Sequence, residues 1–106
     1  MLVVETACKD EAEAGRIAST LVRERLAACA NVLPAVSSFF YWQWTFTGEH
    51  EALVLLKTSE AKRAKLEKRV RQLHSYKCPA IVCWKARANR DYEKWLKAEL
   101  KKKGGK

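Results

Sequence analysis

Apolar residues recur along this chain with two different periods, and the changes of period predict strands and helices in turn. The apolar run over residues 2–8 predicts a short strand. From Ala14 to Leu26 the apolar residues recur three and four positions apart, which predicts an amphipathic helix. Asp10 is suited to cap this helix, because its side chain can accept a hydrogen bond from a free backbone N–H.

The next part of the chain predicts a long hairpin. Residues 28–33 and 36–46 favour extended structure, and Pro34 interrupts the ladder between them. The sequence Thr-Gly-Glu at 47–49 predicts the turn, after which an apolar strand begins at Glu51 and pairs with its predecessor.

The second half repeats the order of strand, helix and strand. Thr58 and Ser59 are candidate caps for a helix that extends to Leu73 with a thin apolar stripe. A loop over 74–79 leads to a short strand over 80–85. Asp91 opens a third helix whose predicted inner side carries four apolar residues: Tyr92, Trp95, Leu96 and Leu100.

The order β-α-β-β-α-β-α predicts an α+β, ferredoxin-like sandwich with a long central hairpin and an extra C-terminal helix. The length allows one domain, over residues 1–100, followed by a flexible lysine-rich tail over 101–106. Two helices cover one face of such a sheet. Because strands such as Leu-Val-Leu-Leu at 53–56 are apolar on both sides, the other face needs a cover as well.

The hairpin is unusually rich in aromatic residues, with six of the ten in the chain. Its aromatic residues are Phe39, Phe40, Tyr41, Trp42, Trp44 and Phe46. Simple alternation places Phe40, Trp42, Trp44 and Phe46 on one side. A strand over 36–46 spans about 35 Å, so it should project beyond its own core. An apolar projecting ribbon favours an obligate homo-oligomer, in which other copies of the chain cover it.

The formal net charge of +9 raises the alternative of a basic module that binds nucleic acid or another anionic surface. Four of the lysines, however, lie in the last six residues, and the others are spread along predicted helices. An RNA-recognition domain of the same βαββαβ order needs a Gly- and aromatic-rich central strand. The sequence Glu-Ala-Leu-Val-Leu-Leu-Lys-Thr over 51–58 has neither feature, so specific nucleic-acid recognition is disfavoured.

No apolar run is long enough to span a bilayer, and the first residues do not have the pattern of a secretory leader. A cytoplasmic location is therefore expected. No glycine-rich nucleotide motif and no nucleophile motif of a hydrolase is present, so the sequence predicts no catalytic residue and no enzymatic activity.

Several segments follow one another in a recognisable order: residues 10–38, the Tyr41-Trp42 pair, 53–60, 73–82 and 91–96. In these segments the sequence resembles the CutA family of divalent-cation tolerance proteins. The combination of Arg-Leu-Ala-Ala-Cys-Ala-Asn, Leu-Leu-Lys-Thr and a His-x-Tyr-x-x-Pro loop is specific. The resemblance implies a homotrimer in which the hairpin wraps onto a neighbouring sheet. It also implies a non-enzymatic role in the response to divalent metals, copper among them, and an architecture similar to the PII signalling proteins.

The chain departs from the family pattern in places that bear on this role. The usual loop His-Pro-Tyr-Glu-x-Pro-Glu has lost both carboxylates here, with Lys77 and Ala80 in their place. Trp44 stands at a usual glycine of the hairpin. Lys9 and Lys85 stand at or near usual prolines.

The candidate metal ligands are His74, Cys78, Cys29 and Cys83, since thiolates and a neutral imidazole suit copper or zinc. Reduced thiols packed as small apolar groups are the alternative for all four cysteines of the chain. On a regular strand Cys78 and Cys83 would face opposite sides. A further crevice between subunits is predicted from Lys57, Tyr76 and Trp95.

Overall fold

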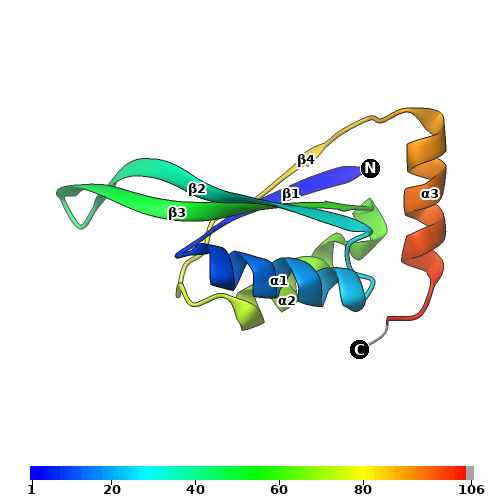
Figure 1. The fold of residues 1–106 in the computed structure, drawn as a ribbon, viewed down its shortest axis with the longest axis horizontal. Coiled ribbons are helices and arrows are strands. Elements are labelled where there is room, and N and C mark those ends of the chain that lie inside the picture. Colours follow the sequence, from blue (N-terminus) through cyan, green and yellow to red (C-terminus); the bar gives the residue numbers. More distant parts are fainter. Residues whose placement is uncertain (105–106) are drawn as a thin grey trace.

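The computed structural model describes residues 1–104 and has the predicted order of strands and helices (Figure 1). The elements are β1 (Leu2–Cys8), α1 (Glu11–Arg23), β2 (Cys29–Trp42), β3 (Thr45–Thr58), a 3-10 turn (Glu60–Lys62), α2 (Arg63–Leu73), β4 (Ile81–Lys85) and α3 (Arg90–Lys101). The strands form one antiparallel sheet in the order β2-β3-β1-β4. This is the split βαβ arrangement, and the predicted α+β class is confirmed.

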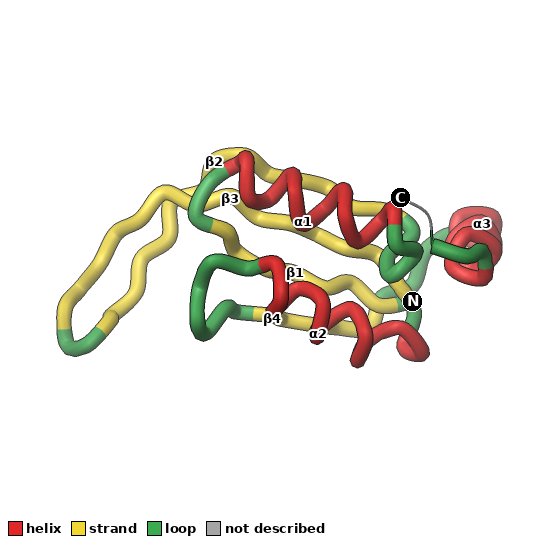
Figure 2. Tube along the Cα trace, turned by 90° about the horizontal axis from the view of Figure 1, so that it is seen from below, coloured by secondary structure: helices red, strands yellow, loops and turns green. Residues whose placement is uncertain are grey.

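Helices α1 and α2 lie side by side on one face of the sheet, and α3 stands at the end where β1 begins (Figure 1, Figure 2). The core lies between these two helices and the alternate strand residues that face them. It contains Val4, Cys8, Ile17, Leu21, Val54, Leu56, Leu66 and Val70. Each of these side chains is at most 1% exposed, so burial of this one layer is the main hydrophobic contribution to folding.

The other face of the sheet, called the outer face here, is also apolar. On the four strands, the apolar residues that alternate with the core positions lie on this face. They are Val3, Leu33, Leu53, Leu55, Val82 and Trp84. Neither α1 nor α2 covers this face, and Leu33, Val82 and Trp84 remain 39%, 49% and 43% exposed. The predicted second apolar face is therefore present, and in the single chain it is exposed at Leu33, Val82 and Trp84, although Val3 is buried.

Beyond the sheet, β2 and β3 continue as a two-stranded ribbon, which gives the molecule its 45 Å length (Figure 1). The register breaks between Leu33 and Val36, so Pro34 lies in a bulge, as its missing N–H predicts. The predicted turn at 47–49 is wrong. The chain turns at Gln43 and Trp44, both with positive φ (48° and 70°), as a two-residue hairpin turn requires.

Gly48 lies inside β3 opposite Phe39, where a Cβ would approach the Phe39 ring to 3.3 Å. The shifted turn also changes the predicted aromatic faces. Because Tyr41 pairs with Phe46, these two residues share a face with Phe39, not with Phe40 and Trp42. The Phe46 ring stacks on Phe39 with centroids 6.2 Å apart and meets the Tyr41 ring edge-on at 5.7 Å. Phe40 and Trp42 lie on the opposite side, which continues the outer face.

Helix α1 ends at Arg23, three residues before the predicted end. Arg25 takes a φ of 61°, and its N–H bonds the Val22 carbonyl while the Leu26 N–H reaches back to Leu21. This pair of bonds is the Schellman termination, formed here without the usual glycine. The helix therefore stops although the apolar period continues to Leu26.

The predicted caps of the second helix are not formed. A 3-10 turn precedes α2, the Ser59 side chain makes no capping bond, and the Thr58 hydroxyl donates to the Leu26 carbonyl at 2.7 Å instead. Helix α3 begins at Arg90 after Asn89, and Leu96 and Leu100 are its buried residues.

Two further predictions concern the C-terminal part of the chain. Trp95 was expected on the inner side of α3 but is 44% exposed. Lys101, placed in the tail by sequence, is the last residue of α3, and Gly104 lies against Glu24. Residues 105–106 of the predicted tail lie outside the described residues.

Replacing Trp44 by glycine is expected to stabilise the ribbon by about 1 kcal/mol. The left-handed backbone at Trp44 is unfavourable for a residue with a Cβ, and the 99% exposed ring has little packing to lose. Trp44→Ala is the matched control, because it removes the ring but keeps the Cβ. Urea denaturation at fixed protein concentration measures the stability of both variants. An equal gain in stability in Trp44→Gly and Trp44→Ala would contradict the idea that the gain comes from the backbone conformation.

Two buried threonines should respond oppositely to replacement by valine. The Thr6 hydroxyl is buried and has no hydrogen-bond partner within residues 1–104, whereas the Thr58 hydroxyl bonds Leu26. Thr6→Val is expected to raise the free energy of unfolding by up to about 1 kcal/mol, and Thr58→Val to lower it by about 1–3 kcal/mol. Urea midpoints measure the stability of the two variants. A loss of stability in Thr6→Val as large as that in Thr58→Val would contradict the expected difference between the two hydroxyl groups.

Candidate metal centre

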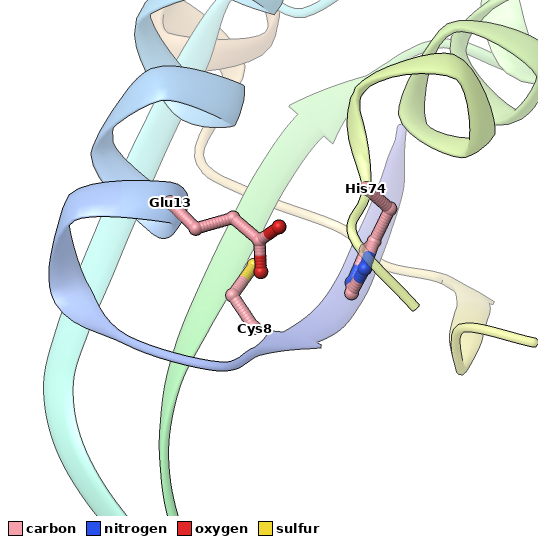
Figure 3. Close-up of side chains that lie close together, drawn as sticks. All are labelled: Cys8, Glu13 and His74. Carbon is pink, nitrogen blue, oxygen red and sulfur yellow. The ribbon is translucent and has the colours of Figure 1, made fainter. Parts of the chain in front are cut away.

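A thiol, a carboxylate and an imidazole converge at the end of the sheet from which the ribbon projects. Cys8, Glu13 and His74 each offer one ligand atom, and these atoms all lie within 4.8 Å of one another. Their exposed fractions are 0%, 0% and 8%. Figure 3 shows the Glu13 carboxylate directed toward the Cys8 sulfur and the His74 ring. Within residues 1–104, this is the one group of at least three His, Cys, Asp or Glu ligands.

The three side chains meet because three elements end at the same place. Cys8 is the last residue of β1, on the side that faces the helices. Only two residues separate it from α1, where the Asp10 carboxylate accepts a hydrogen bond from the Glu13 N–H at 2.9 Å. This N-cap fixes the first turn and holds Glu13 above the strand end. His74 follows the last residue of α2 and lies beside the same strand end.

Both oxygens of Glu13 accept backbone hydrogen bonds. Lys9 N–H donates to Oε1 at 3.0 Å, and Ser75 N–H donates to Oε2 at 2.8 Å. Burial by itself would raise the pKa of Glu13, but the hydrogen bonds from Ser75 and Lys9 outweigh it, and the pKa lies below its ordinary value. Glu13 is thus an anion that ties the β1–α1 connection to the loop after α2.

Both nitrogens of His74 are also engaged. The Tyr76 N–H donates to Nδ1 at 3.1 Å, and Nε2 lies 2.9 Å from the Ala7 carbonyl oxygen. Since Nδ1 accepts, the proton belongs on Nε2, which donates to Ala7. The imidazole is thereby fixed between β1 and its own loop, and the Tyr76 ring lies 4.9 Å away.

Burial, together with the negative charges of Glu13 and Glu51, raises the pKa of the Cys8 thiol to about 12. Cys8 is therefore a neutral thiol at physiological pH and not a reactive thiolate. A cation placed between the sulfur and the carboxylate would reverse this preference, because it favours the ionised form of both.

The donor types fit a borderline or soft divalent cation such as Cu(II) or Zn(II). Ligand atoms around one tetrahedral ion lie about 3.3–3.6 Å apart, so donor atoms that lie within 4.8 Å of one another have to move closer by up to about 1.3 Å to bind it. To bind through His74, the ion must displace one of the two hydrogen bonds of the imidazole. The three side chains thus have the chemistry and the convergence of a metal site, and Glu13 and His74 are each held in place by hydrogen bonds to backbone groups around it.

The sequence-based ligand set overlaps this cluster only at His74. Cys78 is exposed on the loop after α2. Cys29 and Cys83 lie on β2 and β4, the two opposite edge strands, and the register places them on opposite faces of the sheet. Within one chain Cys29 and Cys83 are therefore not brought to one ion.

The residues predicted for a crevice are also separated in one chain. Tyr76 lies near the base of the ribbon and donates its hydroxyl to Glu51 at 2.8 Å. Lys57 lies on β3 six residues beyond Glu51, which is about 20 Å along the strand. Its ammonium group donates to the Asn31 side chain. Trp95 lies on α3 beside Tyr92, with ring centroids 5.5 Å apart. A common crevice for all three would require more than one subunit.

Sequence reasoning missed Cys8 and Glu13. The available signal was the Asp-x-x-Glu spacing at the start of the helix, which marks a capping box with the Glu side chain turned back toward the preceding strand. Cys8 stands two residues before that cap, close enough along the chain for its side chain to meet such a carboxylate. Neither residue stands out by composition or by metal-ligand spacing, which explains the omission.

The fold and the cluster define a small split-βαβ protein with a projecting ribbon and a buried S/N/O ligand group. Comparison with known proteins identifies the family within this class. The profile of the CutA1 divalent ion tolerance protein family matches residues 2–99, and the chain belongs to this family.

Similar proteins support the assignment over nearly the whole chain. The Divalent-cation tolerance protein CutA of Thermus thermophilus is 42% identical over 96 residues, which cover 90% of this chain and 93% of the relative. The Pyrococcus horikoshii protein of that name is 38% identical over 103 residues, 96% of this chain and all of the relative. The crystal structure of CutA1 from Pyrococcus horikoshii superposes with a TM-score of 0.90 at 36% identity, covering 96% and 100%.

A third solved structure has a location in its name. The structure named as the periplasmic divalent cation tolerance protein CutA from Archaeoglobus fulgidus gives a TM-score of 0.90 at 28% identity, covering 94% and 99%. In the described part of this chain, no helix combines the length and the apolar character needed to cross a membrane.

Proposed function

We propose that this protein is a non-enzymatic divalent-metal binder of the CutA family in which Cys8, Glu13 and His74 hold the ion, with copper as the preferred metal. The observation that carries the proposal is the convergence of these three buried donors from three different elements. The names of the relatives, which refer to divalent-cation tolerance, agree with it. Sulfur and imidazole donors favour copper and zinc over magnesium or calcium.

Each residue has a separate task in binding. Glu13 supplies a permanent negative charge, and its backbone partners hold it in place. Cys8 releases its proton on binding, so the affinity should rise with pH. His74 gives up its bond to Tyr76 or to Ala7. A bound cation supplies the charge that stabilises the Cys8 thiolate, and the rearranged loop after α2 offers a route to PII-like signalling.

Titration with Cu(II) and Zn(II) tests the site by calorimetry or competition with a chelator. Cys8→Ser and His74→Ala are each expected to weaken Cu(II) binding by about a hundredfold or more, because even the loss of a group that only orients a ligand costs about 10- to 100-fold. Cys78→Ser is the matched control, an exposed thiol on the same loop as His74 that should leave the affinity unchanged. Circular dichroism verifies that each variant is folded.

The controls also separate this ligand set from the one predicted by sequence. A loss of binding in Cys78→Ser, Cys29→Ser or Cys83→Ser, with Cys8→Ser unaffected, would overturn the buried cluster in favour of a site on those thiols. Binding that survives in every variant would overturn both sets.

We also propose that the native protein is a homotrimer in the cytoplasm, whose ribbons and outer faces cover one another. The uncovered apolar outer face and the exposed aromatic ribbon support self-assembly. Three is the number that the family resemblance implies. Light scattering is expected to give about three times the chain mass of 12.1 kDa, and a value equal to one chain would contradict the trimer.

A further inference from the structure

The segment from Glu60 to Arg71 is strongly basic and lies on the helical side of the sheet. It carries six cationic side chains and only two carboxylates, those of Glu60 and Glu67. Leu66 and Val70 are the buried residues of α2, so the charged side chains lie on the parts of the helix turned away from the core. Figure 2 looks onto this side of the molecule, where α2 lies beside α1 in front of the sheet.

Arginines neutralise the two carboxylates of this segment. Arg63 pairs with Glu60 at 2.9 Å, and Arg71 pairs with Glu67 at 3.8 Å. Within residues 1–104, no carboxylate forms an ion pair with the lysines of the segment, which are Lys62, Lys65 and Lys68. Three positive charges at intervals of three residues are therefore left without a counter-charge from the protein.

A second lysine-rich part of the chain reaches the same side of the sheet. At the end of α1, the Glu24 carboxylate accepts hydrogen bonds from Arg69 of α2, from Nε at 3.0 Å and from Nη2 at 2.9 Å. After α3 the chain returns to the side on which α1 and α2 lie, and Gly104 lies against the Glu24 backbone (Figure 1). The neighbouring Lys103 is exposed and forms no ion pair within the described part of the chain. Lysines that are far apart in the sequence thus contribute to one surface.

The composition of this surface distinguishes between anionic partners. Among the described residues, none of the exposed large apolar side chains belongs to α1 or α2. Stable attachment to a membrane surface takes apolar side chains or a lipid anchor in addition to charge. Proteins that bind single-stranded nucleic acid use aromatic rings on which the bases stack. Cations without apolar or aromatic neighbours match the backbone of a duplex, which carries on the order of ten phosphate charges over the length of α2, about 16 Å.

We propose that a basic helical surface, formed by Lys62, Lys65, Lys68 and Lys103, binds the phosphate backbone of double-stranded nucleic acid without reading its sequence. This interaction goes beyond the proposed metal function, since it uses none of the three metal ligands. The proposed trimer leaves the surface accessible, because its subunits cover one another with their ribbons and outer faces, on the side of the sheet opposite α1 and α2.

Fluorescence anisotropy of a short labelled DNA duplex, titrated with the full chain at several salt concentrations, tests the surface. The double variant Lys65→Gln/Lys68→Gln is expected to bind the duplex about tenfold or more weakly at low salt. The slope of log affinity against log salt concentration should become shallower by about two, because each lost lysine–phosphate contact changes it by about one.

Lys94→Gln/Lys97→Gln is the matched control, since it removes two exposed lysines with the same spacing from α3. It is expected to leave the affinity and the salt slope nearly unchanged, and circular dichroism verifies that both double variants are folded. Equal losses in the two double variants would overturn the proposed surface, because binding would then follow the net charge alone.

Two further probes test the kind of partner. A second duplex of unrelated sequence is expected to bind with the same affinity, and a clear preference for one duplex would overturn backbone recognition. Vesicles of phosphatidylcholine and phosphatidylserine should bind more weakly than the duplex at the same salt concentration. Tighter binding to the vesicles, or no binding of the duplex, would overturn the assignment to nucleic acid. Because no metal is present in these measurements, their failure is distinguishable from failure of the metal site.

Discussion

Replacing Glu13 by glutamine is expected to lower the free energy of unfolding by about 3 kcal/mol at neutral pH. The carboxylate is fully buried and accepts charge-assisted hydrogen bonds from Lys9 and Ser75. A glutamine side chain has one oxygen, so its NH₂ group must face one of these two N–H donors. Because the bonds join the β1–α1 connection to the loop after α2, the loss is not confined to one element.

The same variant should change how stability depends on pH. The pKa of Glu13 is lowered in the folded chain, so its contribution to stability is complete above the ordinary carboxyl pKa and is lost as the pH falls through the native value. The native chain should therefore lose more stability than Glu13→Gln on acidification below about pH 4.5. Urea midpoints at fixed protein concentration, measured from pH 7 to pH 3, give the difference.

Glu11→Gln is the control for this experiment, since Glu11 lies in the same first turn but is exposed. Its pH curve should run parallel to that of the native chain. Parallel curves for Glu13→Gln and the native chain would contradict the role assigned to the buried carboxylate, and so would an equal loss of stability at neutral pH in both variants.

The sequence was sufficient to predict the order of elements, because each strand and helix has its own apolar period. It also predicted the second apolar face, since Leu53 and Leu55 alternate with the core residues Val54 and Leu56. The position of the hairpin turn was missed for a physical reason. Glycine is the usual signal of a turn, but here Gly48 provides room for Phe39, while Gln43 and Trp44 adopt the positive φ values.

The candidate site was predicted only in part. His74 was found because a histidine in a loop is chemically conspicuous. Cys8 and Glu13 belong to the site through the tight connection between β1 and α1, which brings a strand end and a helix start together. Cys29 and Cys83, by contrast, are chemically suitable but are separated by the width of the sheet. Ligand type is visible in a sequence, whereas convergence depends on where the elements end.

Replacing the aromatic residues of the paired ribbon strands by threonine is expected to convert the native assembly into a folded chain of 12.1 kDa. The five positions are Phe39, Phe40, Tyr41, Trp42 and Phe46, which are 39–74% exposed in the single chain. Threonine keeps the preference for strand structure but removes most of the apolar surface. If each protomer of the trimer buries about 1,500 Å² of mostly apolar surface, the hydrophobic contribution is tens of kcal/mol before the entropy of association.

The core of the chain should survive this change, because Val4, Ile17, Leu21 and Leu56 are buried within one protomer and do not contact the ribbon tip. Circular dichroism should therefore retain the helical signal, while light scattering reports the lower mass and the unfolding midpoint falls. Trp44→Ala is the control, since it removes a still more exposed aromatic ring from the turn and not from the paired strands. An unchanged mass in the five-residue variant would place the contact between subunits on the outer face of the sheet alone, and the ribbon would lose its proposed role in assembly.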